Sequence, residues 1–224
     1  MPMATIERPI LVIGNKNYSS WSLRPWLLLR HHGVDFDEVR LPLDTPAFAD
    51  AIGRWSPTRT VPAMRHGELV LWDSLAICEY ANEAFLGGAG WPASRHARAV
   101  ARAASAEMHA GFAALRARMP MNCRRRSAGL ALPAEVQRDV ARVLALWRDC
   151  RARFGDGGPF LFGAFSIADA MYAPVAMRFR SYGIEIDDGA RAWTRALLAL
   201  PAMQEWLDAA ANEPETLAAT DEVA

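Results

Sequence analysis

Three hydroxyl side chains stand next to one another where a helix is expected to begin. Tyr18, Ser19 and Ser20 lie in the stretch Asn17–Trp26, which follows a short apolar run ending at Gly14. A helix that starts in this stretch presents unpaired backbone N–H groups and the positive end of its dipole to the loop. Such a place suits an anion, and a thiolate or a carboxylate is a good candidate. The simpler alternative is that Ser19 or Ser20 only caps the helix.

Two further motifs follow in the same part of the chain. Val61-Pro62 precedes an apolar run, and a proline there lacks an N–H and can take the cis form, which leaves the backbone of Val61 available. Asp73-Ser74 stands at the start of a predicted helix, where either side chain could simply be the N-cap. Each motif has this ordinary structural explanation when taken alone, but the three together indicate one binding site.

The elements that must position these groups form a small α/β module over residues 1–86. Two short apolar runs flank the turn at residues 65–68, which contains a glycine and therefore predicts a β-hairpin. A strand precedes the hydroxyl-bearing loop, and the helix after it ends at Gly33. The predicted order is β-α-β-(α)-β-β-α, with strands near 10–13, 35–41, 61–64 and 69–72, a weak helix within 45–55, and a helix from 74 onward.

The composition changes after the glycine-rich segment 87–92, which we interpret as a linker. Residues 93–224 are predicted to be all-helical, with helices over 93–119, 134–154 and 201–211 and another from Ser166. Ser166 and Asp169 have the spacing of a capping box, in which the serine and the acidic residue satisfy backbone N–H groups reciprocally. Pro133 is predicted at the first helical position of the second of these helices.

Composition and charge exclude several classes of function. The chain has 224 residues, 52% of them hydrophobic, and 25 basic residues balance 25 acidic ones, so no global field attracts nucleic acid or an anionic membrane. The only basic run, Arg124–Arg126, fits a solvated surface. No apolar run approaches the roughly 20 residues that span a bilayer. We also see no secretory signal at the N-terminus, so a cytoplasmic protein without nucleic-acid or membrane partners is expected.

The cysteines and histidines do not form a recognisable site. Cys78, Cys123 and Cys150 are widely spaced and include no CxxC pair, which is typical of free, partly buried thiols in a reducing compartment. The five histidines show no ligand spacing with the cysteines, so no metal cofactor is expected.

The residues described so far resemble those of the glutathione transferase family over nearly the whole chain. Tyr18–Arg24 (YSSWSLR) resembles the serine motif of zeta-like and related cytosolic or bacterial members, and Thr60–Ala63 (TVPA) resembles the family's Val-Pro before a strand. Trp72–Tyr80 (WDSLAICEY) looks like the family's γ-glutamyl motif, and Phe160–Pro174 looks like its capping box and staple. The resemblance implies a thioredoxin-like α/β N-terminal domain, an all-α C-terminal domain, and a homodimer.

What the resemblance implies about the site carries over residue by residue. Ser19 lies five residues before Arg24 and is the first candidate for the hydroxyl that donates to the sulfur of glutathione, the co-substrate. Ser20 is the second candidate, and Tyr18 is the third because tyrosine-type members use a tyrosine near this point. Glutathione itself is expected to contact Val61, Pro62, Asp73 and Ser74. Trp21 stands where zeta members have cysteine, which puts zeta-specific chemistry in doubt.

The family resemblance leaves the reaction open. A bound thiolate could conjugate an electrophile, catalyse a zeta-like cis–trans isomerisation or reduce a peroxide. A catalytically idle interaction protein on the same fold is the alternative. We expect the electrophile pocket between the two domains, with arginines such as Arg178 or Arg180 favouring a carboxylate. The pocket candidates are Met108, Phe112, Tyr172 and Arg178, with Met171, Val175 and Arg180 nearby.

Overall fold

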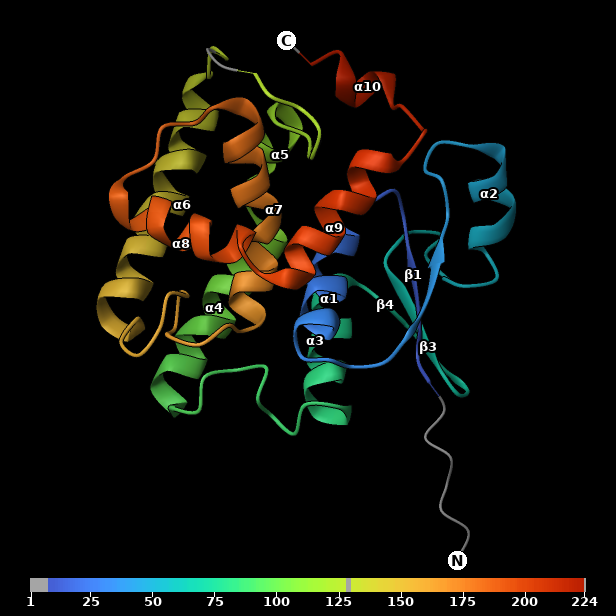
Figure 1. The fold of residues 1–224 in the computed structure, drawn as a ribbon, viewed down its shortest axis with the longest axis horizontal. Helices are drawn as coiled ribbons and strands as arrows, with labels where there is room; N and C mark the ends of the chain where they lie inside the picture. The colour runs from blue at the N-terminus through green and yellow to red at the C-terminus, as the bar shows by residue number, and fades with distance from the viewer. Residues whose placement is uncertain (1–7, 128–129, 224) are drawn as a thin grey trace, which may run out of the picture.

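A four-stranded mixed sheet and a bundle of helices lie side by side in the computed structural model, which describes residues 8–127 and 130–223 (Figure 1). The strand order is β2-β1-β3-β4, in which β1 runs parallel to β2 and antiparallel to β3. β3 and β4 form the predicted hairpin. The strands are β1 (Ile10–Ile13), β2 (Asp37–Arg40), β3 (Ala63–His66) and β4 (Leu69–Trp72).

The helices divide between the sheet module and the second part of the chain. The sheet module holds α1 (Ser20–His31), α2 (Pro46–Ile52) and α3 (Ser74–Ala84). The second part holds α4 (Arg95–Ala110), α5 (Ala113–Arg118), α6 (Ala134–Phe154), α7 (Ile167–Tyr182), α8 (Asp188–Leu198), α9 (Pro201–Asn212) and α10 (Ala218–Asp221). The predicted fold class, an α/β domain followed by a helical one, is confirmed.

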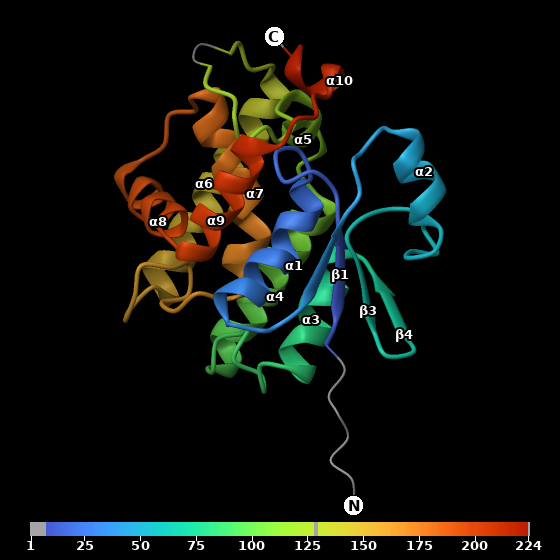
Figure 2. The ribbon, with the colours of Figure 1, turned by 45° about the vertical axis from the view of Figure 1, so that its right-hand side comes forward.

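The two faces of the sheet belong to different cores because successive side chains of a strand point to opposite sides. Leu11 and Ile13 of β1 join the main core, which continues through α1 and α3 into the helical domain. Val12 points the other way, into a smaller core that also contains Ile52 of α2. In Figure 2, α2 accordingly lies apart from α1 and α3, beyond the strands.

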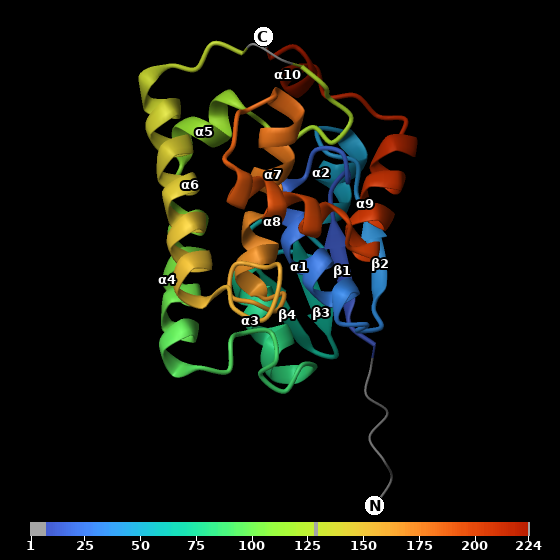
Figure 3. The same ribbon diagram turned by 60° about the vertical axis from the view of Figure 1, so that its left-hand side comes forward.

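Helix α1 is the element on which both halves of the molecule pack. It contacts α3 within the sheet module, and α7 and α9 of the helical domain (Figure 3). Leu23, Trp26 and Leu27 have no exposed surface, and the polar Ser22 and Arg24 are buried with them. The N-terminal end of α1 therefore opens inside the protein, between the two halves.

The long helix predicted over 93–119 is wrong, because α4 ends at Ala110 and α5 begins at Ala113. Gly111, a weak helix former, is extended, and Phe112 takes a left-handed conformation with φ 57°. The Phe112 side chain is buried, and the carboxylate of Asp139 accepts the N–H of Leu115 at the start of α5. Packing and a side-chain acceptor thus override the helical composition of the segment.

Two helices differ from the sequence expectation in other ways. The weak helix within 45–55 is well defined as α2, because Thr45 caps it and Pro46 occupies its first turn. Helix α8 was not predicted, although Asp187 caps it and Trp193 and Leu197 form its buried face. Among residues 8–127 and 130–223, no helix has the length and apolar character needed to cross a membrane.

The segment 87–92 is tied to elements on both sides of it. The amide oxygen of Asn82 in α3 accepts the N–H of Gly90, and the carbonyl of Gly90 accepts the N–H of Ile167 at the start of α7. Trp91 is buried, and its indole donates to Glu79. These contacts fix the path of the chain between the α/β module and the helices; the domain boundary itself stays a prediction.

Asp169 organises the start of α7 with four hydrogen bonds to one buried carboxylate. One oxygen accepts the backbone N–H of Leu161 and the indole N–H of Trp193, and the other accepts the N–H and hydroxyl of Ser166. The predicted capping box is confirmed. Burial raises the pKa of Asp169 even though every one of these donors opposes that rise.

Replacing Asp169 by alanine is expected to lower the free energy of unfolding by at least about 3 kcal/mol, because the change leaves several buried donors without an acceptor. Urea unfolding monitored by circular dichroism measures the loss. The matched control is Asp187→Ala, which removes a capping carboxylate from α8 at a position that is half exposed. The control should cost about 1 kcal/mol, as an ordinary cap does. Equal losses in the two variants would contradict a special role for Asp169.

Candidate functional site

A cavity of about 490 Å³ opens where the N-terminal ends of α1 and α3 meet the segment before β3. Both helices point their positive ends toward it, so it suits a ligand with negative groups. All seven residues predicted to bind or activate the co-substrate border it. The lining consists of Tyr18, Ser19, Ser20, Trp21, Leu43, Phe48, Arg59, Thr60, Val61, Pro62, Asp73 and Ser74.

Ser19 is the N-cap of α1, and its hydroxyl is occupied in that role. It accepts the backbone N–H of Ser22 at 3.4 Å and donates to the Ser22 hydroxyl at 2.7 Å. The Ser22 hydroxyl in turn accepts the N–H of Gly14 at the end of β1. The Ser19 side chain therefore ties the helix start to the sheet, as the simpler interpretation of the sequence expects.

Ser20, the first residue of α1, presents its hydroxyl differently. Its oxygen accepts a hydrogen bond of 3.2 Å from Nη2 of Arg178 in α7. Within the described part of the chain, the Ser20 hydroxyl proton has no acceptor, and neither has the backbone N–H of Trp21, the next residue. Two donors thus remain at the helix start, on residues that line the cavity.

The hydroxyl of Tyr18 is engaged with the C-terminal segment. It donates to the carboxylate of Asp221 at 2.8 Å and accepts from Arg124 at 2.8 Å and from the N–H of Leu217 at 3.2 Å. Arg124 also donates to the carbonyls of Glu213 and Glu215. Arg124 is therefore a structural anchor, whereas the sequence favoured a solvated surface for this basic run.

Asp73 and Ser74, at the start of α3, also line the cavity. One oxygen of Asp73 accepts the N–H groups of Leu75 and Ala76, and the other contacts Nε2 of His109 at 2.9 Å. Asp73 has φ 76°, which is strained for a residue with a side chain, and such conformations concentrate at functional sites. Ser74 accepts a hydrogen bond of 3.1 Å from Arg24.

Arg24 supports two walls of the cavity from behind. Besides its bond to Ser74, its guanidinium lies 4.1 Å from the ring centroid of Trp21, a cation–π contact. Arg116 of α5 faces the same ring at 5.3 Å. Burial and the charges of Arg178 and Arg116 lower the pKa of Arg24 to about 9, so it remains protonated at neutral pH. The sequence motif contained Arg24 only as a marker of spacing.

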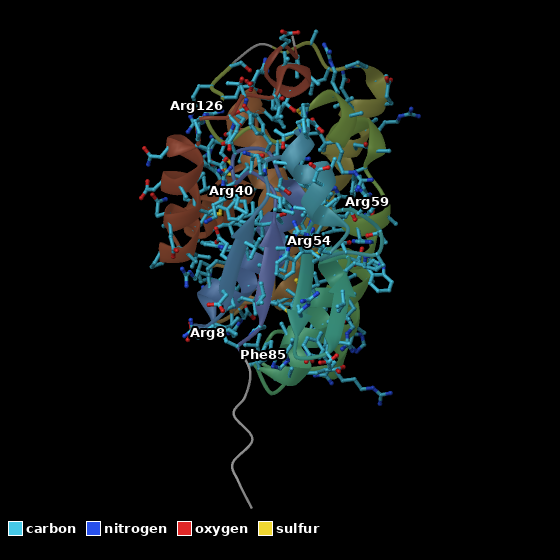
Figure 4. The ribbon with its side chains drawn as sticks, turned by 90° about the vertical axis from the view of Figure 1, so that its right-hand side faces the viewer. Arg8, Arg40, Arg54, Arg59, Phe85 and Arg126 are labelled. Carbon is cyan, nitrogen blue, oxygen red and sulfur yellow. The ribbon has the colours of Figure 1, made fainter. Side chains whose placement is uncertain are left out.

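The third side of the cavity comes from the segment before β3. The peptide bond between Val61 and Pro62 is cis, as the sequence allowed. Arg59, which sequence reasoning missed, lines this side with φ 56° and donates to the carbonyl of Ala49. Figure 4 labels Arg59 together with Arg54, an exposed arginine of the same segment that does not line the cavity. A single arginine in an irregular segment shows no sequence pattern that would identify it as a residue of the cavity before the fold is known.

The four residues predicted for an electrophile pocket are not brought to this cavity. Met108 and Tyr172 have no exposed surface, and the hydroxyl of Tyr172 donates to the carbonyl of Ala104. Phe112 and Arg178 are also buried. Met108, Phe112 and Tyr172 belong to the packing between helices, and in the sequence their size and apolar character did not distinguish a core position from a pocket position. Arg178 does not line the cavity but donates to Ser20, which does.

The free cysteines offer no alternative nucleophile. Cys78, Cys123 and Cys150 are all buried. Burial raises the pKa of the Cys123 and Cys150 thiols to about 12 and raises that of Cys78 as well, so each stays protonated at neutral pH. Among the residues that the structure describes, no group of histidine, cysteine and acidic side chains is arranged to hold a metal ion.

Two parts of the chain match models of the same protein family. Residues 18–84 match the family model described as glutathione S-transferase, N-terminal domain, and residues 133–209 match glutathione S-transferase, C-terminal domain. A comparison with curated protein sequences finds no match.

Several solved structures are similar to this chain. A glutathione transferase homologue from Burkholderia, solved with bound glutathione, has a TM-score of 0.70 and 22% identity, covering 92% of this chain and 99% of its own. A tau class glutathione S-transferase from mango has a TM-score of 0.71, 18% identity and coverages of 97% and 99%. A theta class enzyme from Xanthomonas axonopodis, with glutathione bound, has a TM-score of 0.63, 21% identity and coverages of 90% and 97%. At these identities the likeness shows a shared fold.

Replacing Tyr18 by phenylalanine is expected to loosen the C-terminal segment, because the change removes all three hydrogen bonds of the hydroxyl. Amide hydrogen exchange at residues 217–221 should become about tenfold faster, which corresponds to the ~1.4 kcal/mol that a buried hydrogen bond contributes. The matched control is Tyr80→Phe, which removes a hydroxyl bonded to His66 in the sheet module. Unchanged exchange at 217–221 in the Tyr18 variant would contradict the anchoring role.

Proposed function

The chain belongs to the glutathione S-transferase family, and from this premise we propose that it binds glutathione in the cavity and activates its thiol for attack on an electrophilic small molecule. The observation that carries the proposal is the start of α1, where the Ser20 hydroxyl proton and the Trp21 N–H face a ligand site without acceptors among the described residues. Glutathione, the bound ligand in the Burkholderia and Xanthomonas structures, supplies a sulfur that becomes such an acceptor.

The chemistry needs a thiolate at neutral pH. A free thiol has a pKa of about 8.5, so only a few per cent is ionised at pH 7. A hydroxyl donor, a backbone N–H and the positive end of a helix dipole all stabilise the anion more than the thiol. Lowering the thiol pKa by about two units corresponds to about 2.7 kcal/mol and makes most of the bound glutathione reactive. Holding the electrophile beside the sulfur contributes much of the remaining acceleration.

Ser20 is the donor that we propose, in preference to the first sequence candidate. The hydroxyl of Ser19 donates to Ser22 and that of Tyr18 donates to Asp221, so each would have to break an existing bond to reach the sulfur. Ser20 needs no such exchange. Its oxygen is held by Arg178 and its proton is available. Ser19 then acts only as the N-cap of α1.

The γ-glutamyl end of glutathione would bind at the start of α3. Ser74 accepts from Arg24 and, like Ser20, keeps its own proton for a ligand, here a carboxylate. The carboxylate of Asp73 would attract the α-ammonium group, in competition with His109. The backbone of Val61 would pair with the cysteinyl part, as the family resemblance implies. Glutathione bound in this way would have its thiol near the start of α1.

Arg59 would hold the remaining charged group, the carboxylate of the glycine residue. It is the one arginine among the residues that line the cavity, and it lies on the segment before Pro62. Its bond to the carbonyl of Ala49 fixes the guanidinium at the rim, where it also remains exposed to water. We therefore propose Arg59 as a binding residue with no part in the chemical step.

The electrophile would approach along Trp21, whose ring lines the cavity beside Ser20. Conjugation, peroxide reduction and zeta-like isomerisation all use the same thiolate, so the start of α1 does not discriminate among them. A screen of haloaromatics, peroxides and maleyl-type acids with glutathione distinguishes the three reactions. A homodimer and a cytoplasmic location remain part of this proposal, on the family resemblance alone.

A catalytically idle interaction protein on the same fold is the second candidate, because a fold does not by itself imply an activity. It requires that the cavity not bind glutathione productively. The absence of both retention on immobilised glutathione and quenching of tryptophan fluorescence on adding glutathione would support the idle protein. A chain that binds glutathione but turns over no member of the electrophile panel would support the idle protein.

Replacing Ser20 by alanine is expected to raise the thiol pKa of bound glutathione toward 8.5 and to lower kcat/KM at pH 6.5 by about 100-fold, the loss of one hydrogen bond to a charged group. The pH dependence of turnover with a haloaromatic measures both effects. Ser19→Ala is the matched control and should keep the thiol pKa while losing about 1 kcal/mol of stability with its cap. The reverse result would return the role to Ser19.

Replacing Arg59 by methionine is expected to raise KM for glutathione about fivefold with kcat unchanged, because an exposed ion pair contributes at most about 1 kcal/mol. The effect should vanish with γ-glutamylcysteine, which lacks the glycine carboxylate. Arg54→Met serves as control, since it removes an exposed arginine of the same segment away from the cavity. An equal loss with γ-glutamylcysteine would show that Arg59 does not recognise the glycine end.

A further inference from the structure

We propose that Arg178 is a positioning residue that lowers the thiol pKa of bound glutathione by fixing the Ser20 hydroxyl as a donor and supplying an unneutralised positive charge behind it. The inference rests on the proposed function and deepens it. Arg178 lies on α7, in the helical domain, and Ser20 begins α1 in the sheet module. The activating group would thus be assembled from both halves of the molecule.

Each nitrogen of the Arg178 guanidinium has a partner. Nε donates to the carbonyl of Met119 at 2.7 Å, Nη1 to the carbonyl of Pro174 at 3.3 Å, and Nη2 to the Ser20 hydroxyl at 3.2 Å. Only 4% of the residue is exposed. A guanidinium held this way cannot turn to a substrate carboxylate in the cavity, which is the role that the sequence suggested. It can act on the cavity only through Ser20.

The bond from Arg178 orients the Ser20 hydroxyl. An oxygen that accepts from a cation cannot also turn its proton toward that cation, so the proton must point elsewhere. The same bond polarises the O–H group, since hydrogen bonds in a chain strengthen one another. The hydroxyl is therefore prepared to donate to an anion before glutathione arrives.

The charge of Arg178 has no ion-pair partner among the described acidic residues, and neither has that of Arg24. Burial and the charge of Arg116 lower the pKa of Arg178 to about 10, so it stays cationic at neutral pH. Other groups facing this cluster are Asp73 and His109 at the start of α3 and the end of α4, Tyr182 on α7, and the thiols of Cys78 and Cys123.

A buried positive charge without a partner is costly, and the approach of an anion relieves that cost. The thiolate of glutathione is such an anion when it binds at Ser20. An opposite charge within about 4–6 Å lowers the pKa of an acidic group by roughly 1–3 units. Here the charge acts through an intervening hydroxyl, so the lower end of that range applies.

The test is Arg178→Gln, which removes the charge but keeps an amide that can bond to Met119 or Ser20. The absorbance of the thiolate in the ultraviolet, recorded against pH with saturating glutathione, gives the thiol pKa directly. We expect an upward shift of about one unit, with a parallel shift in the pH profile of kcat. The matched control is Arg180→Gln. Arg180, which the sequence also suggested for a substrate carboxylate, is exposed on the same helix and does not line the cavity, so this change should leave the thiol pKa unchanged.

A double variant tests whether the effect passes through Ser20. If it does, adding Arg178→Gln to Ser20→Ala should shift the thiol pKa by less than half as much as it does in the wild-type chain. An equal shift in both backgrounds would overturn the role of the hydroxyl, and no shift in the single variant would overturn the proposal entirely. Arg178→Lys keeps the charge and should restore part of the original pKa.

The proposal stays testable if the glutamine variant does not fold. In the wild-type chain, the 15N resonance of the Arg178 side chain should titrate together with the thiol of bound glutathione and should not titrate with S-methylglutathione. A resonance that ignores the thiol would overturn the inference. Failure of the wild-type chain to bind glutathione refutes the proposed function, whereas a low thiol pKa that depends on Ser20 but not on Arg178 refutes this inference alone.

Discussion

Two buried guanidinium groups, each donating to the serine that begins a helix, set the character of the cavity. Arg178 holds Ser20 at the start of α1, and Arg24 holds Ser74 at the start of α3. In both pairs the serine oxygen accepts from the cation, and the hydroxyl proton has no acceptor among the described residues. The positive ends of both helix dipoles are also directed at the cavity that these serines line. Neither guanidinium has an ion-pair partner among the described acidic residues, and a buried cation without one is unfavourable, so an anion bound in the cavity would relieve that cost.

The helical domain contributes side chains to this arrangement and does not merely cover it. Arg178 comes from α7, Arg116 faces Trp21 from α5, and His109 of α4 contacts Asp73. The main hydrophobic core also runs without interruption from β1 through α1 into the helices. Because α1 packs on both halves, a shift of the helical domain would move the groups that line the cavity. The shape of the cavity and the packing of the domains therefore depend on the same helix.

Much of the fold could be predicted from the sequence, because short-range signals specify it. The hairpin turn, the Asp169 capping box and the Asp73-Ser74 helix start depend on residues within a few positions of one another, and all three form. The break at Phe112 could not be foreseen. It depends on burial of that side chain and on a carboxylate from α6, contacts that exist only after the chain has folded.

The site shows the same division between local and distant information. The hydroxyls near α1 were recognisable from their spacing, and the structure groups them around one cavity. Which hydroxyl keeps a free proton depends on partners far along the chain, Asp221 for Tyr18 and Arg178 for Ser20. The sequence suggests a substrate carboxylate as the partner of Arg178, because the position of an arginine along the chain does not reveal which groups its nitrogens contact. Ser19, the first candidate, has the correct spacing but is occupied as a cap.

The last described residues have a bearing on how the chain acquires its structure during synthesis. The carboxylate of Glu213 accepts the N–H groups of Lys16 and Asn17, and Asp221 accepts the hydroxyl of Tyr18, across about two hundred positions of sequence. Domains commonly fold in order as they leave the ribosome. Here the loop ahead of the first helix reaches its final form only after residues 213–221 have left the ribosome, so a nascent chain that stops before them would carry an unfinished cavity.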